Sequence, residues 1–219
     1  RGLGDVYKRQ SRWNLHRLLK PNGLDSGKGL RIFHWCGISR SAACRIRRIR
    51  QIGINLNLAP VADLASDQNP SYAMRCLGSD ADGVADLLDD FVSGMREGGL
   101  SVTLKTFPGI GNVSADVTES IAENTDSLMT IRDTNFVPYA SGIQAGADCV
   151  MVSNAAYSKL TVKKVPAFMS QDIVTKLLRE ELGFDGIVMS DWSATYDAVE
   201  AANGGLDLEM PRAKWMNKE

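Results

Sequence analysis

From residue 53 onward, the apolar positions of the chain follow two alternating periods, one typical of strands and one typical of helices. The stretch INLNLAP at 54–60 places apolar side chains at every second position, which predicts a short strand that ends at its proline. Residues 80–97 carry apolar side chains at helical spacing, namely Val84, Leu87, Leu88, Phe91, Val92 and Met95. A Ser-Asp pair can cap the start of this predicted helix, and a Gly-Gly pair can end it.

The same strand-and-helix unit repeats through the rest of the chain. Three more strands are predicted at 101–107 (SVTLKTF), 148–154 (DCVMVSN) and 186–192 (GIVMSDW). Between them lie two helical stripes, formed by Phe136, Val137, Ala140 and Ile143, and by Ile173, Val174, Leu177, Leu178 and Leu182. A short helix near 195–203 precedes a fifth strand in GGLDLEMP. This alternation predicts a parallel sheet with right-handed crossovers, covered by helices.

Each predicted strand finishes in polar residues, which are Asp63, Lys105, Ser153 with Asn154, Asp191 and Glu209. A (β/α)8 TIM-type barrel has this property because its chemistry sits where the carboxyl ends of the strands converge. A doubly wound α/β sheet would also bind ligands at that edge, but no G-x-G-x-x-G or G-x-x-x-x-G-K-[ST] motif follows any strand. We therefore predict an α/β fold of the barrel type, incomplete, with about strands 3 to 7 visible.

Composition points to a globular chain without a metal or an organic cofactor. The 219 residues are 44% hydrophobic, and no apolar run approaches the roughly 18 residues of a membrane span. Four scattered cysteines form neither a zinc motif nor a disulfide framework. We expect a soluble protein, with a cytoplasmic location favoured and export left open because the N-terminus looks incomplete.

Charge divides the chain into two unequal parts. Residues 1–50 carry 13 Lys and Arg against 2 Asp and Glu, whereas the other 169 residues carry 12 against 24. A basic arm of this kind could bind nucleic acid, but the segment has no clear periodicity and opens with RGLGDVYKRQ, which resembles a cloning or assembly artefact. We favour the artefact and expect no nucleic-acid or membrane partner. We therefore divide the chain into a basic segment at 1–50, interpreted as artefactual, and a partial barrel at 51–219.

Five motifs, taken together, resemble the N-terminal barrel domain of glycoside hydrolase family 3 over about 53–211. They are INLNLAPVADL, KTFPGIGNVSAD, VMVSN, GIVMSDW and GLDLEMP. The resemblance implies that Asp191 is the nucleophile of a retaining glycosidase, and a carboxylate can form the glycosyl-enzyme intermediate that this reaction needs. It also makes Trp192 a candidate wall for a sugar face. Without the resemblance, a helix N-cap in a βα loop is an alternative role for Asp191.

The same resemblance implies the residues that hold the sugar. Lys105 matches the lysine of the family motif K-H-F-P-G-H-G, and Arg75, in RCLG, matches the arginine of R-S-F-G; both bind sugar hydroxyls in the family. Asp63 and Met151 are further candidates for substrate contact. Taken alone, Lys105 could be a snorkelling side chain, Arg75 a surface arginine and Asp63 a residue that orients a loop.

The general acid/base is where the chain departs from the family. In the β-N-acetylhexosaminidase branch an Asp-x-His dyad supplies this group, and alignment places Asp116 on the aspartate but Thr118 on the histidine. A threonine hydroxyl cannot transfer a proton near neutral pH. Asp116 or Glu119 could substitute if burial raised its pKa, although a solvated acidic loop is the plainer interpretation. Thr106 and Ile110 also replace the two motif histidines.

The function predicted is an exo-acting retaining β-glycosidase of the β-N-acetylhexosaminidase type, with a small carbohydrate as substrate. One alternative is a β-glucosidase of the same family without its second domain, since the last part of the match looks like that branch. An alternative of another class is a catalytically impaired, carbohydrate-binding barrel. Five strands cannot close an eight-stranded barrel, so further segments or a domain are expected to complete it.

Overall fold

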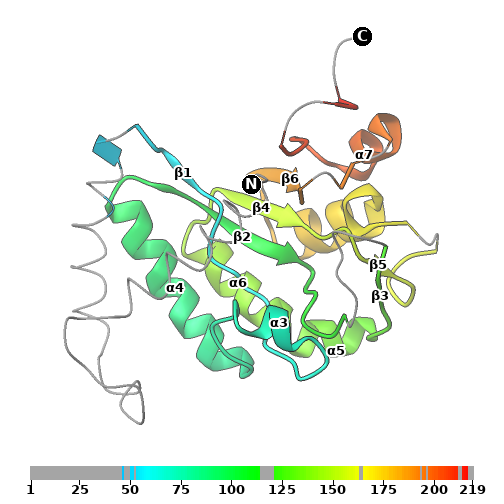
Figure 1. The fold of residues 1–219 in the computed structure, drawn as a ribbon, viewed down its shortest axis with the longest axis horizontal. Coiled ribbons are helices and arrows are strands. Elements are labelled where there is room, and N and C mark those ends of the chain that lie inside the picture. Colours follow the sequence, from blue (N-terminus) through cyan, green and yellow to red (C-terminus); the bar gives the residue numbers. More distant parts are fainter. Residues whose placement is uncertain are drawn as a thin grey trace.

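A computed structural model gives the fold of the chain (Figure 1). The residues that it describes are 46, 50, 51, 53–113, 121–162, 165–192, 194, 195, 197–211 and 214–216. Four parallel strands form the main sheet: β1 (Leu56–Asn57), β2 (Ser101–Phe107), β4 (Cys149–Val152) and β6 (Ile187–Ser190). The four strands predicted from the sequence are therefore present, the first of them much shorter than its apolar pattern suggested.

The order of the strands distinguishes a barrel from a doubly wound sheet. Their spatial order, β1-β2-β4-β6, follows their order along the chain. A doubly wound sheet would reverse direction at a switch point, whereas a barrel adds each strand to the same side of the last. A fifth segment continues this series through a parallel bridge between Met189 and Leu208. The predicted fifth strand is thus reduced to a single bridge, and the strands form an open sector of a barrel.

The helix α4 (Ala81–Glu97) shows how the predicted pattern becomes structure. The Asp80 side chain accepts a hydrogen bond from Gly83 N at 2.8 Å and caps the first turn, and Gly98 is the C-cap. Four positions of the predicted stripe are buried, namely Val84, Leu88, Val92 and Met95. Leu87 lies at the edge of the stripe and remains 39% exposed, so the buried face is narrower than the sequence indicated.

The remaining helices follow the expected alternation. α6 (Phe136–Gln144) packs beside α4 on one side of the sheet (Figure 1), and α7 (Ala198–Gly204) follows β6. Between them, η2 (Asp172–Glu181) is a π-helix, in which Leu182 N bonds to Leu177 O five residues back. Its predicted apolar stripe still packs inward, because Ile173, Val174, Leu177 and Leu178 are all buried.

Several short elements were not predicted. They are α3 (Pro70–Ala73), α5 (Leu128–Asp133), the 3-10 helix η1 (Ala167–Met169), and a small parallel sheet of β3 (Glu123–Asn124) and β5 (Ala156–Tyr157). The small sheet lies beyond the carboxyl ends of β2 and β4 (Figure 1). It connects the loop after β2 to the loop after β4, so it adds order at the edge where the polar residues gather.

The two faces of the main sheet are buried in different ways. Alternate residues of the strands, such as Val102, Leu104 and Val150, belong to the large apolar core that the helices complete. On the opposite face, Cys149, Met151 and Met189 form a separate small cluster with Leu56, Leu58 and Met210. This second cluster contains no helical residue among those described. It therefore corresponds to the interior of a barrel, which strands alone line.

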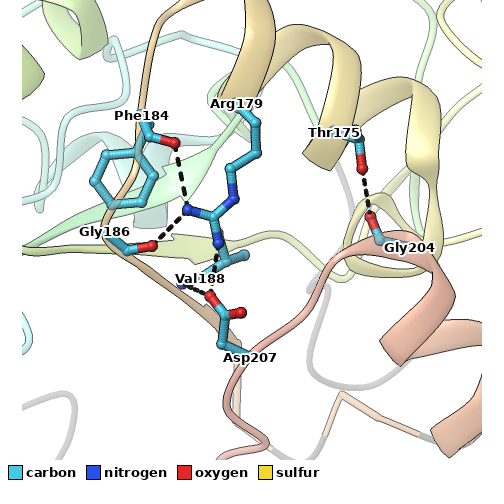
Figure 2. A network of polar contacts seen from close by, with 7 residues as sticks. All are labelled: Thr175, Arg179, Phe184, Gly186, Val188, Gly204 and Asp207. Atoms are coloured by element: carbon cyan, nitrogen blue, oxygen red, sulfur yellow. Dashed lines mark hydrogen bonds and ion pairs between the residues drawn. The ribbon is translucent and has the colours of Figure 1, made fainter.

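An arginine, an aspartate and a strand N–H tie the far end of η2 to β6 (Figure 2). Arg179 donates to the carbonyls of Phe184 and Gly186 and to Asp207 Oδ2 at 2.7 Å. The same Oδ2 accepts Val188 N at 2.7 Å. These contacts hold the helix, the turn and the fifth segment in one register at the amino end of the sheet.

Candidate active site

The polar residues at the strand ends gather at the carboxyl edge of the sheet, as the sequence predicted. Asp63, Lys105, Ser153, Asn154, Asp191 and Glu209 are all buried. In the register of the sheet Lys105 pairs with Met151, and Met151 pairs with Met189, so these three residues form one row across β2, β4 and β6. Asp191 follows Met189 by two positions and lies just beyond this row. The fold thus brings Lys105, Met151 and Asp191 to one place.

Asp191 is a buried carboxyl group whose pKa is affected by two nearby cations. Its Oδ1 accepts Trp192 N at 2.7 Å, and the residue is 7% exposed. Burial raises the pKa of Asp191, and the Trp192 N–H, Lys105 and Arg75 oppose this rise. The helix N-cap interpretation does not apply to the helix that follows, because α7 is capped by Asp197, which accepts Glu200 N at 3.0 Å.

Lys105 is one of the most deeply buried side chains of the described chain, at 1% exposure. Burial lowers its pKa to about 7, and the positive charge of Arg75 adds to this effect. Asp191 and then Asp63 act in the opposite direction. An ammonium group in this position can donate hydrogen bonds in several directions to a polar ligand. The snorkelling interpretation fails because the residue is buried.

Asp63 is the centre of a hydrogen-bond cluster. Its Oδ1 accepts Thr106 N at 3.1 Å and the Tyr139 hydroxyl at 2.8 Å. Its Oδ2 accepts the Tyr72 hydroxyl at 2.6 Å, the Thr106 hydroxyl at 2.9 Å and Ile110 N at 3.3 Å. Burial raises the pKa of Asp63, while the hydrogen bonds from Tyr72, Tyr139 and Thr106 lower it. With both oxygens bonded within the protein, Asp63 organises the turn that follows Lys105.

Arg75 lies against an aromatic residue that sequence reasoning missed. Its guanidinium carbon is 4.8 Å from the centroid of the Tyr72 ring, and its Nε is buried with no hydrogen-bond partner. A buried donor of this kind costs free energy unless a ligand accepts from it. Tyr72 precedes Arg75 by three residues, a spacing that places two side chains on one face of a helical turn, and this was the signal available in the sequence.

The turn after β2 is fixed from several sides. The Gly109 carbonyl accepts the Tyr157 hydroxyl at 2.8 Å and Asn124 Nδ2 at 3.5 Å. Gly109 itself has φ +120° and no room for a Cβ, which would lie 1.7 Å from Asn135 Nδ2, so only glycine fits. Outside the described residues lie the two candidate proton donors, Asp116 and Glu119, and also Thr118, which stands at the position of the family histidine.

Three other predicted residues take structural positions. Met151 packs in the small apolar cluster with Cys149 and Met189. Trp192 is partly buried directly after Asp191, and its backbone N–H supports that carboxyl group. Glu209 accepts three backbone N–H groups at 2.9 to 3.0 Å, from residues 214, 215 and 216, and so holds the C-terminal turn. Contact of Met151 and Trp192 with a sugar stays a prediction.

A cavity of about 430 Å³ opens elsewhere on the molecule. It lies between the segment 161–172 and α7, and none of the predicted site residues lines it. Within the described ranges no helix is long and apolar enough to cross a membrane. Across the same residues, His, Cys, Asp and Glu form no group of three or more that could hold a metal ion.

Comparison with known protein families identifies the fold. The model of the "Glycosyl hydrolase family 3 N terminal domain" matches residues 37–214. The chain belongs to this family. The match confirms the resemblance carried by the five motifs and extends beyond both ends of the region in which they lie.

Several curated proteins are similar to this chain in sequence. A "Beta-hexosaminidase" of Xylella fastidiosa is 37% identical over 143 residues, which are 65% of this chain and 42% of that protein. A "Beta-hexosaminidase" of Stenotrophomonas maltophilia is 36% identical over 152 residues, 69% of this chain and 44% of that protein. The chain therefore spans less than half the length of these relatives.

Solved structures of the family agree with the observed topology. A glycoside hydrolase family 3 β-N-acetylglucosaminidase from Paenibacillus sp. str. FPU-7 superposes with a TM-score of 0.73 at 30% identity, covering 78% of this chain and 35% of that one. A β-N-acetylhexosaminidase from Beutenbergia cavernae superposes with a TM-score of 0.71 at 34% identity, covering 80% and 56%. The predicted barrel-type α/β fold is confirmed, with the barrel not closed.

Proposed function

We propose that this chain is the N-terminal barrel part of an exo-acting, retaining β-glycosidase of the β-N-acetylhexosaminidase type. The observation that carries the proposal is the buried carboxyl group of Asp191 at the carboxyl edge of the sheet, with the charges of Lys105 and Arg75 acting on it. A nucleophilic carboxylate needs nearby cations to stay ionised when it is removed from water. The same cations are hydrogen-bond donors for sugar hydroxyls.

In the proposed reaction Asp191 attacks the anomeric carbon of the non-reducing sugar. The glycosidic bond breaks, the leaving-group oxygen departs as an anion or takes up a proton, and a glycosyl ester forms on Asp191. Water then attacks the anomeric carbon, loses a proton to solvent or to a base, and releases Asp191 as the carboxylate with overall retention. Lys105 and Arg75 hold the sugar ring. Asp63, whose two oxygens are bonded within the protein, acts on the substrate through the turn that it fixes.

The two central groups of the proposed site are shielded from water. Lys105 and Asp191 are only 1% and 7% exposed. Exclusion of water from the reacting atoms strengthens their electrostatic contacts with a bound sugar.

The substrate proposed first is a β-linked N-acetylglucosaminide, and a β-glucoside is second. The curated relatives at 36 to 37% identity are named β-hexosaminidases, and the Paenibacillus structure is named a β-N-acetylglucosaminidase. The resemblance of the segment 189–211 to the β-glucosidase branch supports the second substrate.

An activated 2-fluoro sugar fluoride tests the nucleophile directly. We expect mass spectrometry of the treated protein to find one sugar adduct, on a peptide containing Asp191, because the fluorine slows hydrolysis of the ester. Asp191→Asn should abolish the adduct, whereas Asp185→Asn, a change at an exposed carboxylate of the same peptide region, should leave it intact. A label on another carboxylate would refute the role of Asp191.

Thr118 supports a second candidate function, a barrel that binds carbohydrate but does not turn it over. Threonine stands where the hexosaminidase branch has its acid/base histidine, and a hydroxyl cannot replace that group near neutral pH. Binding of N-acetylglucosamine measured by calorimetry, together with no adduct on Asp191, would favour this function over the enzyme.

A further inference from the structure

Tyr72 contacts both Arg75 and the turn after β2 in the candidate active site. It lies in α3, where its backbone N bonds to Asn69 Oδ1 at 3.3 Å, and it is 7% exposed. One part of the side chain, the ring, faces Arg75. The other part, the hydroxyl, reaches the turn after Lys105.

The ring supports Arg75. The guanidinium carbon lies 4.8 Å from the ring centroid, and Arg75 N bonds to the Tyr72 carbonyl at 2.8 Å, so both the backbone and the ring of Tyr72 place this arginine. The buried Nε of Arg75 has no hydrogen-bond partner. The stacking contact orders the guanidinium while leaving this donor for a ligand.

The hydroxyl connects to the residue after Lys105. It lies 2.6 Å from Asp63 Oδ2 and 2.8 Å from the Thr106 hydroxyl, which itself donates to the same Asp63 oxygen at 2.9 Å. The three oxygen atoms therefore form a closed triangle. Because Thr106 directly follows Lys105, this triangle fixes the end of β2 from which the Lys105 side chain projects.

We propose that Tyr72 is a positioning residue for sugar recognition, which orders Arg75 through its ring and the end of β2 through its hydroxyl. This inference rests on the proposed function, since it assigns Tyr72 to the sugar site of the same enzyme. Arg75 and Lys105 hold the sugar in the ground state and in the transition state alike. Loss of their positioning should therefore raise KM more than it lowers kcat.

The test uses the complete natural protein that contains this chain, with 4-nitrophenyl N-acetyl-β-glucosaminide as substrate. Tyr72→Leu removes the ring face and the hydroxyl, and we expect KM to rise about tenfold with kcat within about twofold of the unaltered enzyme. Tyr72→Phe keeps the ring, so KM should rise only about threefold. A fall in kcat with KM unchanged would overturn the inference.

A double-mutant cycle shows whether Tyr72 acts through Arg75. On an Arg75→Ala background, where the stacking partner is absent, Tyr72→Leu should raise KM by less than about threefold, the share of the hydroxyl. The same tenfold rise on both backgrounds would contradict the proposal.

Tyr139→Phe is the matched control for the hydroxyl. Tyr139 also donates to Asp63, at 2.8 Å, but its described ring contact is with Phe107, at 5.1 Å. We expect KM to rise less for this variant than for Tyr72→Phe, because the Tyr72 hydroxyl also contacts Thr106, and an equal rise would assign the effect to Asp63 in general.

A spectroscopic measurement keeps the inference separate from the proposed activity. The Nε–H resonance of Arg75 should carry a ring-current shift in the unaltered protein and in Tyr72→Phe, and should lose it in Tyr72→Leu. If the protein neither binds nor hydrolyses the glycoside, the proposed function fails, and the Arg75 resonance still tests whether Tyr72 positions Arg75. A resonance unchanged by Tyr72→Leu would overturn this positioning role.

Discussion

Burial and neighbouring charges act in opposite directions on the pKa values of Asp191 and Lys105. Burial raises the pKa of Asp191 and lowers that of Lys105 to about 7, so desolvation favours the neutral form of both groups. Their mutual attraction acts against desolvation, and the charge of Arg75 helps Asp191 while it opposes Lys105. The two cations therefore favour the ionised form of the proposed nucleophile, against the effect of burial.

The pH dependence of the reaction should report this balance. The nucleophile must be ionised, so kcat/KM falls as pH drops through the pKa of Asp191, which burial has raised above 3.8. Lys105 is charged below about pH 7 and lowers that pKa. Lys105→Met should therefore move the acidic limb of the kcat/KM profile to higher pH. Rates with an activated aryl glycoside between pH 3 and 8 measure the shift.

Lys176→Met serves as the control for this profile. Lys176 is an exposed lysine paired with Asp172 at 2.7 Å on η2, so its removal should leave the acidic limb in place. An acidic limb that moved to lower pH in Lys105→Met, or moved equally in both variants, would contradict the assigned interaction.

The sequence predicted these residues through motif position but could not predict how they are held. Asp63 was a candidate either for substrate contact or for orienting a loop, and its oxygens accept five bonds within the protein, from Tyr72, Thr106, Ile110 and Tyr139. Tyr139 is 76 residues from Asp63 along the chain. Such a cluster depends on how α6 packs against β2, and no local pattern encodes that contact.

At the level of elements, the junctions between helices and strands repeat one arrangement. Arg96, in the last turn of α4, bonds to the Gly146 carbonyl and to Asp148 at 2.8 Å, and Asp148 accepts Val102 N at 2.9 Å. The contacts of Arg179, Asp207 and Val188 in Figure 2 follow the same scheme. In both, the aspartate stands just before one segment of the sheet and accepts the N–H of a residue in the neighbouring strand, Val102 in β2 or Val188 in β6. We call each set of Arg, Asp and strand N–H a clamp, and each clamp sets the register between the two neighbouring segments.

The clamp at Asp207 should stabilise the fold measurably. The Arg179–Asp207 pair is partly exposed, and its ionic part contributes at most about 1 kcal/mol. The bond from Val188 N matters more, because Val188 is fully buried and its N–H would lose its acceptor. We expect Asp207→Ala to lower the free energy of unfolding by about 2 kcal/mol, measured by urea denaturation.

Asp185→Ala is the matched control, because Asp185 is an exposed aspartate in the adjoining turn. It should change the free energy of unfolding by less than about 0.5 kcal/mol. Equal losses for the two variants would show that the turn, rather than the carboxylate clamp, determines the stability.

Elements with long apolar patterns were predicted well, and short ones were not. α4 and β2 lie where their periodicity placed them, because seventeen and seven residues give a clear period. α5 buries only Ile131, and β3 pairs with β5 over two residues each, so neither leaves a periodic signal. The π-helical winding of η2 was also beyond prediction, since a stripe of this length suits an α-helix as well.

At the level of the whole molecule, the sheet is an open part of a barrel, and the candidate site residues lie together at its carboxyl edge. Four strands and one bridged segment bring Lys105 and the proposed nucleophile Asp191 to one edge of the sheet, while the helices cover one face of the sheet. The relatives matched are more than twice as long as the matched part. In the proposed reaction, described residues attack and bind the sugar, whereas the candidate proton donors Asp116 and Glu119 lie outside the described residues.

The leaving group should determine how much the loss of the family histidine lowers the rate. With Thr118 at the histidine position, aryl glycosides whose leaving groups need no proton should react at least about a hundredfold faster than natural disaccharides, since general acid catalysis contributes about 10²–10⁴-fold. Thr118→His should accelerate hydrolysis of an N-acetylglucosamine disaccharide and leave the 2,4-dinitrophenyl glycoside nearly unchanged. The ratio of kcat/KM for the two substrates measures this effect. Equal acceleration of both would mean that the histidine acts on binding or folding, and a natural disaccharide already hydrolysed as fast as the aryl glycoside would show that another residue donates the proton.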